Sequence, residues 1–190
     1  LLYHAYRAVA KNNEPEILNK AKTLLEKGLS KYPDNANIIE CLTDVYVALG
    51  EDPQGIVPVV EAAIAKDPKN TALWNGLGRI YERLGNVDKS IESFEHVAQL
   101  SPDDFVANYS IGILYIRKAD AMMNEVNDKT YSGQAEYDAE LAKVFDVYKK
   151  SVGPLEKAHE LNPDENVTLE LLKSVTFRLR DTEGMMDKYN

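Results

Sequence analysis

Few residues of this 190-residue chain are placed for metal or nucleophilic chemistry. His159 follows Glu156 at the Glu-x-x-His spacing used by di-iron helical bundles, which need a second copy on another helix. The segment around His96 does not supply that copy. The single cysteine, Cys41, cannot form an internal disulfide or a Cys-x-x-Cys site. No His or Arg stands on its neighbouring turn to lower the thiol pKa, so Cys41 is predicted to be a bystander.

Known catalytic and phosphate-binding motifs are also missing from the sequence. It has no glycine-rich phosphate loop, HExxH motif, nucleophile elbow or EF-hand loop. Acidic pairs such as Asp103-Asp104 and Asp164-Glu165 follow prolines where helices are expected to begin, and the helix dipole favours carboxylates there. The sequence therefore predicts a protein that is not an enzyme and binds no cofactor or metal.

The overall charge narrows the choice of partners. The 22 Lys and Arg residues against 31 Asp and Glu residues give a net charge of −9. A nucleic-acid-binding face needs clustered basic residues, so no nucleic-acid partner is expected. No apolar stretch approaches the roughly 18–20 residues of a membrane span. The chain begins at Leu1 without Met and is interpreted as trimmed, which leaves a cytoplasmic and an exported or periplasmic location both open.

An internal repeat dominates the sequence. Four prolines recur at steps of 35, 34 and 61: Pro33, Pro68, Pro102 and Pro163. Three tyrosines recur at the same first two spacings, 35 and 34 residues: Tyr46, Tyr81 and Tyr115. The third proline step exceeds the second by 27. A period of about 34 residues indicates a stacked repeat architecture, here with one insertion of about 27 residues.

Each repeat is predicted to form two helices. In residues 71–104, apolar residues recur at steps of three and four until Gly85-Asn86 interrupts the pattern. A second stripe follows and ends at Ser101-Pro102, since the residue before proline is pushed out of helical geometry. Gly78 lies on the packing face, where a neighbouring helix is expected to approach closely. Neither helix can bury its stripe alone, so the repeats must stack into a solenoid.

The set Trp74-x-x-Leu77-Gly78-x-x-Tyr81, followed by Ser90, Phe94 and Pro102, resembles a tetratricopeptide repeat. The resemblance extends over nearly the whole chain and implies an all-α, right-handed superhelical solenoid of helix-turn-helix repeats with one elongated helical hairpin. It divides residues 1–190, as a single solenoid, into repeats at about 1–35, 36–70, 71–104, 105–165 and an incomplete 166–190. The composition and linkers resemble those of bacterial members, including exported ones.

The insertion near 119–146 is predicted to lengthen both helices of its repeat. Apolar stripes continue on both sides of 127–133, whose residues favour a turn. The result would be an antiparallel hairpin that projects on the order of 20 Å, at about 1.5 Å per residue. Either the Met and Tyr residues merely hold the two helices together, or the hairpin is a docking arm for a partner.

In tetratricopeptide proteins the first helices of successive repeats line a concave groove that binds an extended peptide or a helix. The predicted partner-binding residues on these helices are Glu40, Asp44, Asn75, Arg79, Arg83, Tyr109, Ile113 and Arg117. Asn37, Glu170 and Arg178 occupy similar positions. The acidic residues disfavour the family's carboxylate clamp. Arg79 and Arg83 are expected to pair with acidic groups of a partner, while Tyr109 and Ile113 accept an apolar side chain.

A simpler explanation exists for two of these arginines. Arg83 and Arg117 are expected near the C-terminal ends of their helices, where the dipole favours a cation by roughly 0.3–1 kcal/mol. The sequence as a whole predicts a non-catalytic protein–protein interaction scaffold that binds a partner segment in its groove. The alternative is an assembly protein that self-associates weakly through the hairpin or the open C-terminal repeat.

Overall fold

The structure is a computed structural model that describes residues 15–33 and 35–179. Across these residues the chain folds into helices joined by short turns, without strands. Contacts divide it into two compact units, residues 1–100 (unit 1) and 101–190 (unit 2), and each is described by itself. The expected first helix of the first repeat lies largely outside the described residues, as does the turn expected at 180–184. No helix in the described part is long and apolar enough to span a membrane.

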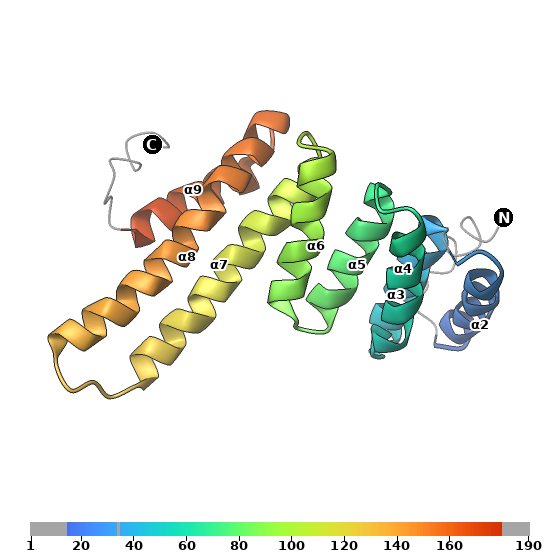
Figure 1. The fold of residues 1–190 in the computed structure, drawn as a ribbon, viewed down its shortest axis with the longest axis horizontal. Coiled ribbons are helices and arrows are strands. Elements are labelled where there is room, and N and C mark those ends of the chain that lie inside the picture. The colour runs from blue at the N-terminus through green and yellow to red at the C-terminus, as the bar shows by residue number, and fades with distance from the viewer. Residues whose placement is uncertain (1–14, 34, 180–190) are drawn as a thin grey trace. The chain divides into compact units, whose positions relative to one another are not determined.

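Unit 1 contains helices that pack in sequential pairs (Figure 1). They are α2 (Pro15–Lys31), α3 (Ala36–Leu49), the short 3-10 helix η1 (Pro53–Ile56), α4 (Val57–Lys66), α5 (Thr71–Arg83) and α6 (Val87–Leu100). Helix α2 packs on α3, α3 on α5, α4 on α5 and α5 on α6. This is the helix-turn-helix repetition that the proline spacing predicts.

The turns of unit 1 form where the sequence predicts them. Asn35 caps α3 because its side-chain oxygen accepts from the Ile38 N–H at 3.1 Å. Gly85 follows α5 with φ +72°, a left-handed conformation that other residues adopt only at a cost. The predicted break at Gly85-Asn86 is therefore confirmed, and it lets α6 fold back against α5.

Gly78 produces the close helix contact predicted for it. A Cβ at this position would lie 2.9 Å from the ring of Phe94, which is fully buried. The Ser90 hydroxyl donates to the Gly78 carbonyl at 2.8 Å across the same contact. The repeat residues Gly78, Ser90 and Phe94 thus hold α5 and α6 together, while the apolar stripes of α2, α3, α4 and α5 form the core of unit 1.

Unit 2 contains the elongated hairpin (Figure 1). Its helices are α7 (Phe105–Asp128), α8 (Gln134–Leu161) and α9 (Asn166–Arg178). Asp104 caps α7 by accepting from the Ala107 N–H at 2.9 Å, which confirms the capping role expected of that acidic pair. Helices α7 and α8 lie side by side over their length, as expected of the insertion near 119–146.

Helix α9 packs on the hairpin and shares its core. The centre of this packing is Tyr148, whose side chain is fully buried. Its hydroxyl donates to the Asp120 carboxylate and accepts from the Arg178 guanidinium at 2.9 Å, and Arg178 also pairs with Asp120. The base of the lengthened hairpin is therefore fixed to α9 by a polar cluster as well as by apolar contacts.

Candidate functional site

The predicted partner-binding residues of unit 1 lie on α3 and α5, which pack directly against each other. Gly76 allows this approach, since a Cβ there would lie 3.2 Å from the side chain of Ile39. The Arg79 guanidinium then reaches Glu40 at 2.8 Å and Asp44 at 2.6 Å. The two carboxylates and the arginine form one charge cluster.

This pairing reduces the number of N–H donors that Arg79 can offer to a partner. Its two terminal nitrogens are engaged within the chain, although a guanidinium has five N–H donors in all. The side chains of Arg79 and Glu40 are 40% and 51% exposed, so each ion pair contributes only about 0.2–1 kcal/mol to stability. The cluster is therefore weak as a structural element and stays open to rearrangement by a bound segment.

Asn75 and Arg83 share the α5 face with Arg79, because they stand four residues before and after it. The Asn75 side chain is half-buried, and its Oδ1 is buried without a hydrogen-bond partner among the described residues. Arg83 is exposed and is the last residue of α5. Its position at the helix end agrees with the dipole explanation.

Cys41 lies beside this cluster but is not a reactive thiol. It is buried, and burial, reinforced by the negative charges of Glu40 and Asp44, raises the pKa of Cys41 from 9.0 to about 11. The thiolate fraction at pH 8 is therefore about one hundredfold below that of an ordinary cysteine.

We expect native Cys41 to react with Ellman's reagent at pH 8 at least about one hundredfold more slowly than the urea-unfolded chain, because the native thiol is both protonated and covered. The absorbance of released thionitrobenzoate measures this rate. Equal rates in the two states would contradict the burial of Cys41.

The remaining predicted residues belong to unit 2. Tyr109 is half-buried and stacks on Phe105 with ring centroids 5.6 Å apart. Burial raises the pKa of Tyr109, the charge of Glu165 raises it further, and Arg117 opposes this shift. Tyr109, Arg117 and Glu165 therefore lie within electrostatic reach of one another. Ile113 is half-buried on the same helix.

The expected explanation for Arg117 is wrong. Helix α7 continues to Asp128, so Arg117 lies 11 positions before the end of the helix. The dipole effect is confined to the last turn and does not apply to it. Arg178, which the sequence predicts at a position similar to those of the partner-binding residues, instead binds Asp120 and Tyr148 of the hairpin.

The hairpin interior supports the first of its two interpretations. Val126 and Val144 are buried between the helices, and Met122 and Met123 are half-buried against the same core. Tyr131 and Tyr137 pack edge to face near the turn, with centroids 5.5 Å apart. These side chains hold the two helices together, and a docking role for the hairpin stays a prediction.

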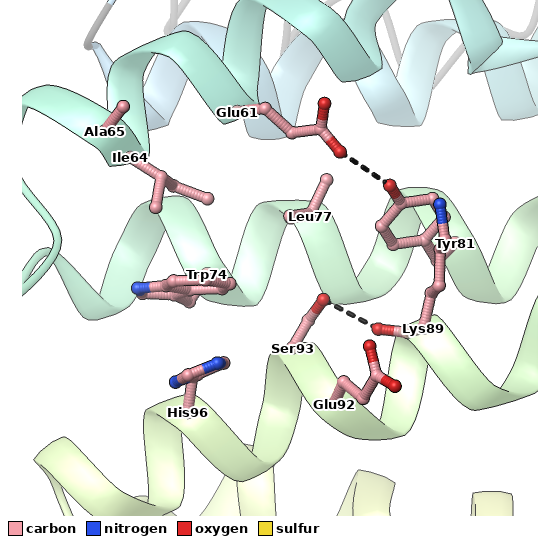
Figure 2. A pocket seen from close by; sticks show the side chains of 10 residues that line it. All are labelled: Glu61, Ile64, Ala65, Trp74, Leu77, Tyr81, Lys89, Glu92, Ser93 and His96. Atoms are coloured by element: carbon pink, nitrogen blue, oxygen red, sulfur yellow. Dashed lines mark hydrogen bonds between the residues drawn. The ribbon is translucent and has the colours of Figure 1, made fainter.

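A pocket that the sequence did not indicate lies between α4, α5 and α6 (Figure 2). Its volume is about 370 Å³, and the rings of Trp74 and Tyr81 form part of its wall. Trp74 is half-buried and packs against the core of unit 1, and its indole N–H donates to the Pro68 carbonyl at 2.9 Å. No group of three or more His, Cys, Asp or Glu residues in the described part of the chain is arranged to hold a metal ion.

The succession of antiparallel helices joined by short turns, with glycines at the close contacts between helices, places the chain in the class of α-helical repeat proteins. The tetratricopeptide repeat model matches residues 71–104, the repeat with Trp74, Gly78 and Phe94. Residues 71–104 are therefore a tetratricopeptide repeat, as their spacing predicts.

Known proteins resemble the chain over most of its length. The TPR repeat-containing protein MJ1428 of Methanocaldococcus jannaschii is 23% identical over 220 residues, covering all of this chain and 37% of the relative. The human IFIT1 dimer with m7Gppp-AAAA superposes with a TM-score of 0.64 at 20% identity, over 97% of this chain and 39% of that one. MamA superposes with a TM-score of 0.62 at 13% identity, over 99% and 86%. The chain thus spans little more than a third of the length of MJ1428. The similarity to the solved structures shows that the chain shares their fold.

Proposed function

We propose that the chain is a non-catalytic scaffold that binds an extended segment of a partner protein on the face formed by α3 and α5. Tetratricopeptide repeats generally serve as protein–protein interaction scaffolds, which gives the class of function. The proposal rests on one observation at Asn75: its buried Oδ1 has no hydrogen-bond partner among the described residues. A buried oxygen without a partner costs about 1–3 kcal/mol in the free protein.

A bound segment would remove this cost. Because the Asn75 side chain is only half-buried, an extended segment bound over it can reach it, and a backbone N–H of that segment can donate to the oxygen. Arg79 retains N–H donors beyond the two that bind Glu40 and Asp44. Arg83, exposed at the end of α5, is the cation that an acidic side chain of the partner would meet.

Side chains of α7 contribute a second part to this proposal. Tyr109 and Ile113 are half-buried apolar side chains on this helix, and they would accept an apolar side chain of a partner. Their position beside Arg117 and Glu165 gives the surface both signs of charge. Taken separately, the α3–α5 face is expected to bind acidic residues of a partner protein, and the α7 surface is expected to bind apolar residues.

Asn75→Ala is expected to weaken partner binding without destabilising the protein. The substitution removes an unpaired polar group and introduces a better helix former, so the free energy of unfolding should stay equal or rise by about 0.5–1 kcal/mol. Partner affinity should fall about fivefold or more, since a hydrogen bond to the partner is lost. Urea unfolding and quantitative affinity capture, with bound proteins measured by mass spectrometry, give the two values.

Arg83→Glu has a matched control on another helix. Lys66 is also exposed and is also the last residue of its helix, α4, so Lys66→Glu changes the same charge at an equivalent helix position. Arg83→Glu should reduce capture and Lys66→Glu should not. Capture that is insensitive to both Asn75→Ala and Arg83→Glu would contradict binding on this face.

The alternative, self-association, is favoured by one observation. Helix α9 exposes apolar side chains, with Phe177 70% and Val167 48% accessible. Light scattering coupled to size exclusion tests it, since a mass that rises with concentration and falls with Phe177→Ser would support assembly through α9.

A further inference from the structure

Trp74, Leu77 and Tyr81 of α5 line the pocket between α4, α5 and α6 (Figure 2). Asn75 and Arg79 are not among the residues that line it. Its volume of about 370 Å³ is at the lower end of the range for ligand sites, about 300–1,000 Å³. That space suits a single long side chain better than a large ligand.

Aromatic rings supply the apolar wall of this pocket. Trp74 stacks on His96 with ring centroids 4.1 Å apart and an interplanar angle of 23°, and Figure 2 shows the two rings lying face to face. The hydrogen bond from the indole N–H to Pro68 fixes the orientation of Trp74. Tyr81 lies farther along α5 in the same wall. Faces of Trp and Tyr rings attract cations through their quadrupoles.

Carboxylates supply the charge. Glu61 of α4 accepts from the Tyr81 hydroxyl at 2.8 Å, and Glu92 of α6 also lines the pocket. Both glutamates are exposed, and Glu92 makes no hydrogen bond or ion pair within the described residues. Burial of Tyr81, its hydrogen bond to Glu61 and the negative charge of both glutamates raise the pKa of Tyr81 to about 12. The pocket is therefore electronegative at its aromatic wall.

The molecule already places a cation at this wall. The Lys89 ammonium lies 5.0 Å from the centroid of the Tyr81 ring. Lys89 is exposed, and its side chain makes no ion pair among the described residues, so no ion pair fixes the position of its ammonium group. An ammonium group is thus accommodated over Tyr81, while Trp74 and Glu92 remain available to a second cation.

The preceding repeat provides an internal comparison. A pocket of about 280 Å³ lies there, and the Tyr46 hydroxyl donates to Glu26 as Tyr81 donates to Glu61. One repeat before Trp74, Lys89, Glu92 and His96, the sequence has Ile39, Gly55, Pro58 and Ala62. The pocket shape is thus a property of the repeat, whereas the ring pair and second carboxylate are particular to residues 71–104.

We propose that the Trp74 pocket binds a lysine or arginine side chain of a partner protein, between the aromatic wall and the carboxylates of Glu61 and Glu92. The ligand class follows from charge complementarity, since the lining carries two carboxylates and one lysine. The pocket would bind a cationic side chain, whereas Arg83 is expected to bind an acidic one. The proposal for the pocket does not depend on whether a segment binds α3 and α5.

Trp74 is the only tryptophan, so its fluorescence reports directly on the pocket. The probe is the blocked tripeptide acetyl-Gly-Arg-Gly-amide, titrated into the full chain at low ionic strength. Because one side chain makes few contacts, we expect a Kd on the order of 1 mM. The citrulline tripeptide, which keeps the shape and removes the charge, should not saturate the signal. Added salt of about 0.5 M should weaken binding.

Variants test each component. Glu61→Gln, which keeps an acceptor for Tyr81, and Glu92→Gln should each weaken binding about two- to fivefold. Glu125→Gln, an exposed glutamate of α7, removes the same charge outside the pocket and should leave binding unchanged. Lys89→Gln should strengthen binding by a similar factor, because it removes the competing ammonium.

Several outcomes would overturn the proposal. They are no fluorescence change up to about 20 mM peptide, equal binding of the citrulline peptide, or equal loss with Glu125→Gln. Saturable binding of free arginine without binding of the tripeptide would assign the pocket to a small molecule instead. None of these results bears on capture by the α3–α5 face, which depends on Asn75 and Arg83.

Discussion

Tyr148→Ala is expected to lower the free energy of unfolding of unit 2 by about 3–5 kcal/mol. The side chain is 1% exposed and packs in the core that α7, α8 and α9 share. Removing it leaves a cavity and also leaves Asp120 and Arg178 without their common partner. Urea unfolding followed by circular dichroism measures the loss.

Tyr148→Phe separates packing from polar contacts. Phenylalanine fills the same volume but neither donates to Asp120 nor accepts from Arg178. Because Asp120 and Arg178 can still pair with each other, we expect a loss of only about 1–2 kcal/mol. A loss with Phe as large as that with Ala would contradict the assignment of most of the effect to packing.

Gly112→Ala is expected to destabilise unit 2 by about 1–2 kcal/mol, although alanine is the better helix former. A Cβ at this position would lie 2.5 Å from Cγ of Leu155, a fully buried side chain of α8. Overpacking costs about 1–3 kcal/mol, and the gain in helix propensity, about 1 kcal/mol, offsets only part of it. The same unfolding measurement gives the value.

A double-mutant cycle makes this prediction specific. Leu155→Ala alone should cost about 2–5 kcal/mol because it opens a cavity opposite Gly112. In that background Gly112→Ala should stabilise the protein, since the added methyl group enters free space and the helix propensity gain remains. If Gly112→Ala has the same sign in both backgrounds, the steric explanation is wrong.

The repeat could be predicted because its signals are local. Gly85 allows the left-handed turn after α5, Asp104 caps α7, and the residue before Pro102 ends α6. Gly78 and Phe94 stand within one repeat, on two helices that the turn at Gly85 folds back against each other, so their contact depends on local signals. The elongated hairpin was predictable for the same reason, since both apolar stripes continue through the insertion.

Contacts between repeats were not predictable in the same way. Arg79 pairs with Glu40 and Asp44, which lie 39 and 35 residues away, and only the packing of α3 against α5 sets the reach of these side chains. The Trp74 pocket likewise needs side chains from α4, α5 and α6 at once. The periodicity assigns a residue to a face of its helix but does not give its neighbour on another helix.

Site-specific photo-crosslinking tests binding on the α3–α5 face most directly. We would place p-benzoylphenylalanine at Arg83 on α5 and, as the control, at Ala62, an exposed residue of α4. The proposal predicts that position 83 crosslinks to a partner protein in cells, and that Asn75→Ala reduces this crosslink while position 62 gives no such product. The same partner crosslinked equally at both positions, or at position 62 alone, would contradict the proposal.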